Sequence, residues 1–187
     1  LQSNNTFLVD KSKKMNYLEK LINSKNILHF NEKDSFTESG IYMLYPNFDL
    51  EKITNQTYLK VGITDGEKGL SKRLSRHFGK SKVKEIIDKS GKVIKLKGGT
   101  VLHRHMYFDK TLGEKFGFNF KNPKSRSDFL KEHCYFKVLT SIELHLKEKD
   151  SELTIKKRLR NIESKIEVTL GKKKNIRYCD EVFFEDY

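Results

Sequence analysis

The chain has 187 residues, of which 34% are charged, and it carries a net charge of +13. A chain of this length fits one domain, which can bury a sizeable core without metal or disulfide support. The positive excess attracts polyanions over long range, so nucleic acid is the expected partner. No apolar run approaches the roughly 20 residues that cross a bilayer, so we expect no membrane-spanning segment and no membrane partner.

Cysteine usage indicates the compartment. Cys134 and Cys179 are the two cysteines of the chain, and two are too few for a disulfide framework or an all-cysteine zinc site. We therefore expect a reducing, cytoplasmic setting.

A helix is predicted near the start of the chain, over residues 10–26, with Asp10 or Ser12 as its cap. Its apolar residues at helical spacing are Met15, Leu18, Leu21 and Ile22. The residues from 30 to 38 are polar and predict a loop that leads into the first strand.

Two short β-prone runs come next, residues 39–45 and residues 58–64, and the segment between them is longer than a tight turn. Apolar residues dominate both runs, which predicts two paired strands joined by an expanded loop. Each strand carries one notable polar residue, Tyr42 in the first and Lys60 in the second.

Three further elements are predicted from spacing. A helix over residues 70–78 places Arg73 and His77 four positions apart, on one face. Residues 134–139 indicate a buried strand. A final helix over residues 152–170 has an apolar stripe, and Glu163 lies next to it, close enough to reach toward the core. The stripe consists of Leu159, Ile162, Ile166 and Leu170.

A strongly basic segment lies between the second strand and the buried strand. Residues 80–110 contain nine lysines and arginines against three acidic residues. Within this segment, residues 92–97 and 100–108 are β-prone and are joined by Gly98-Gly99, which predicts a basic hairpin that can enter the major groove of DNA. Residues 111–128 predict an irregular segment, anchored in the core by Phe116, Phe118 and Phe120.

Several of these residues stand in a telling order. Gly40-Ile41-Tyr42, Lys60-Val61-Gly62, Arg73 with His77, Glu163 and the later Asn175 together resemble the GIY-YIG nuclease family. The resemblance covers roughly residues 40–78 and 134–175. The family's second signature usually begins with tyrosine, where this chain has Lys60, and a lysine there resembles some restriction-endonuclease members.

The resemblance implies an α+β fold, in which a small central antiparallel or mixed three-stranded sheet is flanked by helices. The whole chain, residues 1–187, would form one nuclease domain. Residues 1–38 would be an N-terminal helix extension, and residues 80–128 a basic insertion that contacts DNA.

The resemblance also implies a catalytic set, namely Tyr42, Lys60, Arg73, His77 and Glu163. Phosphodiester hydrolysis needs an activated water and charge stabilisation on the phosphate. Tyr42 and Lys60 are expected to activate the water as a pair, with the division between them open. Arg73 would grip the phosphate through two donors. Glu163 would coordinate one Mg²⁺, which Mn²⁺ can replace.

The remaining predicted contacts are with DNA. Tyr58 is expected to share a sheet face with Lys60, because side chains alternate along a strand. His103 and His105 would share one face of the second strand of the predicted hairpin. Their spacing is too nonspecific to indicate a zinc site, and we expect phosphate or base contacts instead. The expected DNA-binding residues are Asn175, Tyr58, Arg76, Lys92, Lys95, Lys97, His103, Arg104 and His105.

The sequence thus predicts a magnesium-dependent, sequence-specific endonuclease for double-stranded DNA, of the stand-alone type II restriction kind. Two alternatives stay open: a domain of a homing, structure-specific or repair nuclease, and an inactive DNA-binding protein in which Lys60 marks lost activity. A palindromic target would favour a two-fold homodimer. Taken singly, Lys60 could be a solvated edge charge and Glu163 a helical ion pair with Arg160; their joint order argues otherwise.

Overall fold

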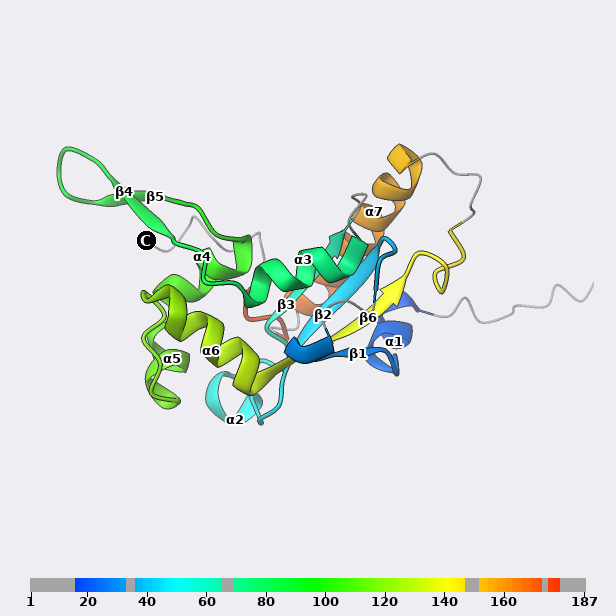
Figure 1. The fold of residues 1–187 in the computed structure, drawn as a ribbon, viewed down its shortest axis with the longest axis horizontal. Coiled ribbons are helices and arrows are strands. Elements are labelled where there is room, and N and C mark those ends of the chain that lie inside the picture. Colours follow the sequence, from blue (N-terminus) through cyan, green and yellow to red (C-terminus); the bar gives the residue numbers. More distant parts are fainter. Residues whose placement is uncertain (1–15, 33–35, 65–68, 147–151, 173–174, 179–187) are drawn as a thin grey trace, which may run out of the picture.

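A computed structural model describes residues 16–32, 36–64, 69–146, 152–172 and 175–178. In these residues the fold is a mixture of helices and strands, built on a small antiparallel sheet (Figure 1). The strands are β1 (Ile27–Leu28), β2 (Gly40–Pro46), β3 (Lys60–Thr64), β4 (Lys84–Ile87), β5 (Val93–Lys97) and β6 (Cys134–Thr140). The helices are α1 (Tyr17–Ile22), α2 (Glu51–Thr54), α3 (Gly69–Phe78), α4 (Val101–Phe108), α5 (Lys110–Lys115), α6 (Pro123–His133) and α7 (Glu152–Lys172), with a short 3-10 turn at Phe30–Glu32.

The central sheet has the strand order β1-β6-β2-β3 within the described residues, and every neighbouring pair is antiparallel. An α+β fold with a small antiparallel sheet flanked by helices is therefore confirmed. The expected number of three strands was wrong by one, because residues 27–28 pair with β6 and add a two-residue edge strand.

Each face of the sheet is covered by a different helix, α3 on one side and α7 on the other (Figure 1). Tyr42 and Leu44 pack with residues of α3 and α6, whereas Ile41 and Met43 pack with the apolar stripe of α7. The alternation of side chains along β2 thus divides the core into two layers. The predicted helices at residues 70–78 and 152–170 and the predicted strand at residues 134–139 are confirmed.

The N-terminal helix is confirmed over Tyr17–Ile22, and the prediction was wrong for residues 23–26, which follow the end of the helix. Helix α1 begins after Asn16, whose side chain accepts a hydrogen bond from the backbone N–H of Leu18. The two predicted cap residues, Asp10 and Ser12, lie outside the described residues.

The basic hairpin exists, but the sequence prediction placed it wrongly. Strands β4 and β5 form it, and its turn lies at residues 88–92, where the Asp88 carboxylate accepts hydrogen bonds from the backbone of Ser90 and Lys92. We call residues 84–97 the ribbon; it projects from the body of the molecule (Figure 1).

The segment after the ribbon is helix α4 and not a strand, so the prediction for residues 100–108 was wrong. The Thr100 side chain accepts a hydrogen bond from the backbone N–H of His103, while the His103 side chain accepts one from the backbone N–H of Thr100. This reciprocal cap starts a helix. Gly98 and Gly99 have positive φ angles of 82° and 59° and turn the chain into that helix.

Residues 111–128 are also more regular than predicted. They contain most of α5 and the start of α6, whose first residue is Pro123 and whose cap is Asn122. A proline at the first helical position needs no N–H partner. The three phenylalanines do belong to the core, as expected: Phe120 is buried, and Phe116 and Phe118 pack against it partly buried.

Candidate functional site

Tyr42 lies in the middle of β2, directly opposite Gly62 of β3. A Cβ atom at position 62 would collide with the hydroxyl and ring of Tyr42. The glycine therefore creates the space in which the phenol lies over the strand. Tyr42 is 1% exposed.

Helix α3 brings two further side chains to Tyr42. The hydroxyl of Tyr42 and Nε2 of His77 are 2.7 Å apart, and both groups are buried. Arg73, one helical turn earlier, also acts on the phenol, because its positive charge lowers the pKa of Tyr42. Its Nε is buried and has no hydrogen-bond partner within the described part of the chain. A buried donor without an acceptor is rare and calls for an explanation.

The environment keeps Tyr42 and His77 uncharged. Burial raises the pKa of the Tyr42 phenol above its usual value, while the neighbouring Arg73 and Lys60 lower that pKa and Glu163 raises it. Burial holds the pKa of His77 well below its usual value, and the positive charge of Arg73 lowers this pKa further. The pair is therefore a neutral phenol against a neutral imidazole at pH 7.

Lys60 lies on the Tyr42 face of the sheet, opposite Leu44. It is 3% exposed, and its Nζ lies 2.9 Å from Oε1 of Glu167 on α7. Lys60 is thus not a solvated edge charge. Sequence reasoning missed Glu167, although its position four residues after Glu163 places both carboxylates on one helix face.

Glu163 lies one turn before Glu167 and is partly exposed. Its negative charge acts on Tyr42. The other four residues of the predicted catalytic set, from β3, α3 and α7, therefore all act on the phenol of Tyr42 in β2. Of the five, Arg73 and Glu163 keep exposed surface, whereas Tyr42, Lys60 and His77 are buried.

Two of the predicted DNA contacts lie at the start of β3. Tyr58 does not share a face with Lys60: its ring packs on Tyr45 at 4.7 Å and belongs to the opposite core layer. The prediction failed because β3 begins only at Lys60, so the alternation does not extend back to Tyr58. Asn175 lies beside Tyr58, and its carbonyl accepts the backbone N–H groups of Thr57 and Tyr58.

The other predicted DNA contacts differ in how exposed their side chains are. Arg76 on α3 is exposed, as are three lysines of the ribbon, Lys92, Lys95 and Lys97. His103 is fully buried and bonded through both ring nitrogens, so it is not a surface residue. The other two are partly buried: Arg104 donates to the carbonyls of Gly98 and Gly99 at the ribbon base, and the His105 ring lies against Tyr178.

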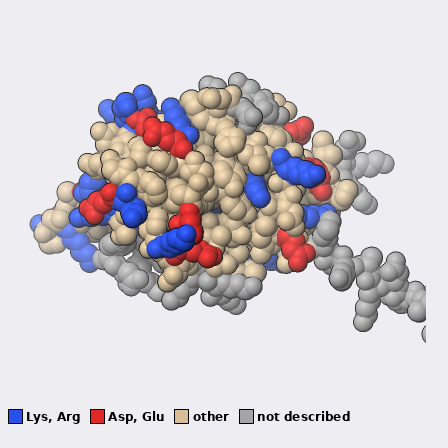
Figure 2. All heavy atoms as spheres, turned by 90° about the horizontal axis from the view of Figure 1, so that it is seen from below, with Lys and Arg blue, Asp and Glu red and all other residues tan. Residues whose placement is uncertain are grey.

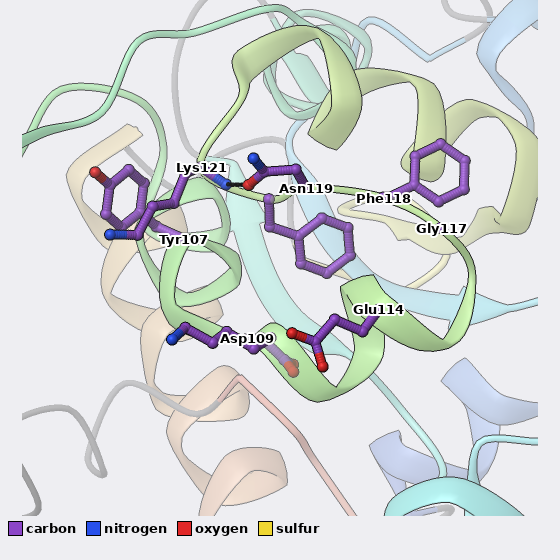
Figure 3. Close-up of a pocket in the computed structure, with 9 residues that line it drawn as sticks. Tyr107, Asp109, Glu114, Gly117, Phe118, Asn119 and Lys121 are labelled. Atoms are coloured by element: carbon purple, nitrogen blue, oxygen red, sulfur yellow. Dashed lines mark hydrogen bonds between the residues drawn. The ribbon is translucent and has the colours of Figure 1, made fainter.

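A hollow of about 480 Å³ lies elsewhere, between α4, α5 and the loop of residues 117–121 (Figure 3). It has an aromatic and basic side, where Lys121 lies over the ring of Tyr107. Its other side carries Glu114 and Asp109, and the Asp109 carboxylate is already bonded to Arg177 and Tyr178. None of the predicted catalytic residues lines it.

Comparison with known proteins adds no relative. No protein-family model matches the chain, and neither a curated protein nor a solved structure matches it. Among the described helices, none is long and apolar enough to cross a lipid bilayer.

Proposed function

We propose that this protein is a divalent-cation-dependent endonuclease for double-stranded DNA, of the GIY-YIG type. One observation carries the proposal: Arg73 holds a buried, unpartnered Nε donor beside the Tyr42 hydroxyl, where Lys60, His77 and Glu163 also act. A guanidinium with free donors suits a phosphate oxygen, because its planar fork matches that geometry.

Arg73 is the proposed phosphate ligand. It keeps exposed surface, so a DNA backbone can reach it, and it stands next to the phenol. Its positive charge would stabilise the negative charge that grows on the phosphate as the bond to water forms. The surrounding protein strengthens this effect, because charges interact more strongly where water is excluded.

Tyr42 is the proposed contact for the attacking water. The Lys60 ammonium is held by the Glu167 carboxylate at 2.9 Å, and an ion pair favours the charged form of a lysine. Lys60 therefore serves as a fixed positive charge near the Tyr42 hydroxyl, whose pKa it lowers. This divides the roles that the sequence left open.

Glu163 is the residue that would hold the cation. Mg²⁺ is commonly bound by one or two carboxylates, with water and phosphate oxygens completing the shell. Glu163 is partly exposed, and the neighbouring Glu167 is buried against Lys60. No group of three or more metal-ligating side chains occurs among the described residues. The bound cation would supply charge neutralisation at the phosphate, and Mn²⁺ could replace Mg²⁺.

The ribbon is the proposed source of DNA affinity. A two-stranded ribbon fits the major groove, and residues 84–97 carry five lysines against two acidic residues. The restriction type of nuclease, with a cytoplasmic location and a homodimer on a palindromic target, is the form we propose, because the recognition surface lies within the same chain.

The test is cleavage of a mixed-sequence plasmid in the presence of Mg²⁺. We expect discrete fragments from the wild type and loss of cleavage by at least about a hundredfold in Arg73→Ala, as for other charge-stabilising donors. Lys72→Ala is the matched control, since it removes an exposed positive charge from the same helix. Wild-type cleavage by Arg73→Ala would overturn the assignment, and bound but intact DNA with the wild type would indicate a binding protein.

A further inference from the structure

Thr100 connects the ribbon to the proposed catalytic site. It stands three residues after the end of β5 and caps α4, and it is 4% exposed. Its Oγ1 lies 3.0 Å from Nδ1 of His77, on the side of the imidazole away from Tyr42. No feature of the sequence singled out this threonine.

The neighbouring His103 fixes the first part of the hydrogen-bond network. The backbone N–H of Thr100 donates to Nδ1 of His103, so that nitrogen carries no proton. Nε2 of His103 lies 2.7 Å from the carbonyl oxygen of His77 and must donate to it. Burial lowers the pKa of His103 to about 4, which agrees with one proton on the ring.

The hydroxyl of Thr100 then has one available role. Its oxygen accepts the backbone N–H of His103 at 3.3 Å. Its hydrogen needs an acceptor, and Nδ1 of His77 is the acceptor within reach in the described structure. In the opposite tautomer, with the proton on Nδ1, the threonine hydrogen would be buried without a partner, which is unfavourable.

We infer that Thr100 is a positioning residue that holds His77 in the tautomer protonated at Nε2. His77 then donates to the oxygen of Tyr42 across the 2.7 Å contact and cannot accept the phenol hydrogen. The hydrogen of Tyr42 is left for the substrate side. The expected effect of Thr100 on catalysis rests on the proposed function. The assignment of protons in the hydrogen-bond network does not depend on that function.

The base of the ribbon keeps Thr100 in place. Arg104 donates to the carbonyl of Gly98 at 3.2 Å. A Cβ on Gly98 would lie 2.5 Å from the carbonyl of Lys82, in the segment that leads into β4. The segments before β4 and after β5 therefore meet at the first turn of α4. The imidazole of His77 is thus held between Thr100 on its Nδ1 side and Tyr42 of the sheet on its Nε2 side.

The first test is the nitrogen NMR spectrum of the imidazoles in the full chain, labelled with ¹⁵N-histidine, at pH 7. The signals of His77 are identified by their loss in His77→Gln. We expect Nδ1 of His77 to be of the unprotonated type and Nε2 of the protonated type in the wild type. A proton on Nδ1 would overturn the inference, and this measurement needs neither a variant at Thr100 nor nuclease activity.

The second test compares two variants of Thr100. Thr100→Ser keeps the hydroxyl and should keep both the tautomer and kcat. Thr100→Val removes the hydroxyl at nearly constant volume and should give a mixed tautomer signal, with kcat lowered about tenfold and KM little changed. A wild-type kcat in Thr100→Val would overturn the catalytic consequence. A wild type that cleaves no DNA would contradict the proposed function and leave the proton assignment to the spectrum.

Discussion

Lys60 is buried in the sheet with its charge compensated from another layer of the fold. Its ammonium reaches Glu167, and the side chains of the two are 4% and 11% exposed. Taking a charge out of water is unfavourable, and the pair persists because each member neutralises the other. A lysine in this strand thus requires a carboxylate on α7, which ties the helix to the edge strand β3.

Removing one member of this pair should destabilise the protein strongly. We expect Lys60→Met to lower the free energy of unfolding by about 3–5 kcal/mol, because it removes the ammonium that pairs with the buried Glu167 carboxylate. Urea denaturation checks this value. Lys124→Met is the control, since its pair with Asp128 is exposed and should matter little. Equal effects of the two substitutions would mean that the buried charge is solvated.

Two buried histidines should make stability depend on pH. The pKa values of His77 and His103 are lowered in the folded protein by burial, that of His103 to about 4. The unfolded chain binds protons on both below about pH 6.5, and the folded chain does not. The free energy of unfolding should therefore fall as pH drops from 6.5 toward 4, by up to roughly 1.4 kcal/mol per pH unit for each histidine.

Urea titrations at pH 7, 6 and 5 measure this slope. His103→Gln should lower stability at pH 7 and make the slope below pH 6.5 shallower, because one proton no longer distinguishes the two states. His145→Gln changes an exposed histidine and should leave the slope unchanged. A flat profile in the wild type would show that the buried imidazoles bind protons as readily in the folded protein as in the unfolded chain.

The ribbon depends on the backbone at its base. Gly98 and Gly91 both have positive φ angles, 82° and 86°. A Cβ on Gly98 would lie 2.5 Å from the carbonyl of Lys82, whereas a Cβ on Gly91, in the turn, would meet nothing within 4 Å. A substitution at Gly91 therefore tests backbone strain alone, and one at Gly98 tests strain together with a steric clash.

Alanine at these two positions should have different effects. Gly91→Ala introduces strain alone, of about 1 kcal/mol, whereas Gly98→Ala adds a collision and should cost clearly more. Amide hydrogen exchange in β4 and β5 measures the opening of the ribbon. Equal protection in the two variants would contradict a ribbon base packed as tightly as described.

The positive charge is distributed unevenly over the whole molecule. The face in Figure 2 carries lysines and arginines interspersed with acidic side chains over a largely uncharged surface. Residues 84–97 contain five lysines and two acidic residues. The long-range attraction for a polyanion should therefore be strongest at the ribbon.

Neutralising the ribbon should reduce the salt dependence of DNA binding. In Lys92→Gln/Lys95→Gln/Lys97→Gln, we expect weaker binding and a slope of log K against log salt that is smaller by roughly 0.9 for each lost phosphate contact. The control variant is Lys25→Gln/Lys52→Gln/Lys157→Gln, at exposed lysines outside the ribbon. Fluorescence anisotropy at several salt concentrations measures both. An unchanged slope in the ribbon variant would remove it from the interface.

Removal of divalent cations should separate catalysis from folding. Because the proposed cation would be held at the partly exposed Glu163, a chelator should abolish cleavage and leave the melting temperature unchanged. Differential scanning calorimetry with and without EDTA provides the second measurement. A large drop in melting temperature would indicate a structural metal site.

Local patterns predicted the elements whose signals are local. Helical spacing identified α3 and α7, and an apolar run identified β6, because burial of one face imposes a period on the residues that form it. The order of Tyr42, Lys60, Arg73, His77 and Glu163 predicted a common site, and the structure brings them together around one phenol. The predicted strand at residues 100–108 failed because a side-chain cap and two glycines outweighed its β-prone composition.

Contacts between distant segments could not be predicted in this way. Glu167 meets Lys60 across 107 residues, and Thr100 meets His77 across 23. No local period encodes either contact, because each depends on how one element packs against another. The amino-acid sequence thus specified the chemical groups of the site and their order, whereas packing determined their charge and proton positions, since both depend on burial and on partners that only the folded chain brings within hydrogen-bond distance.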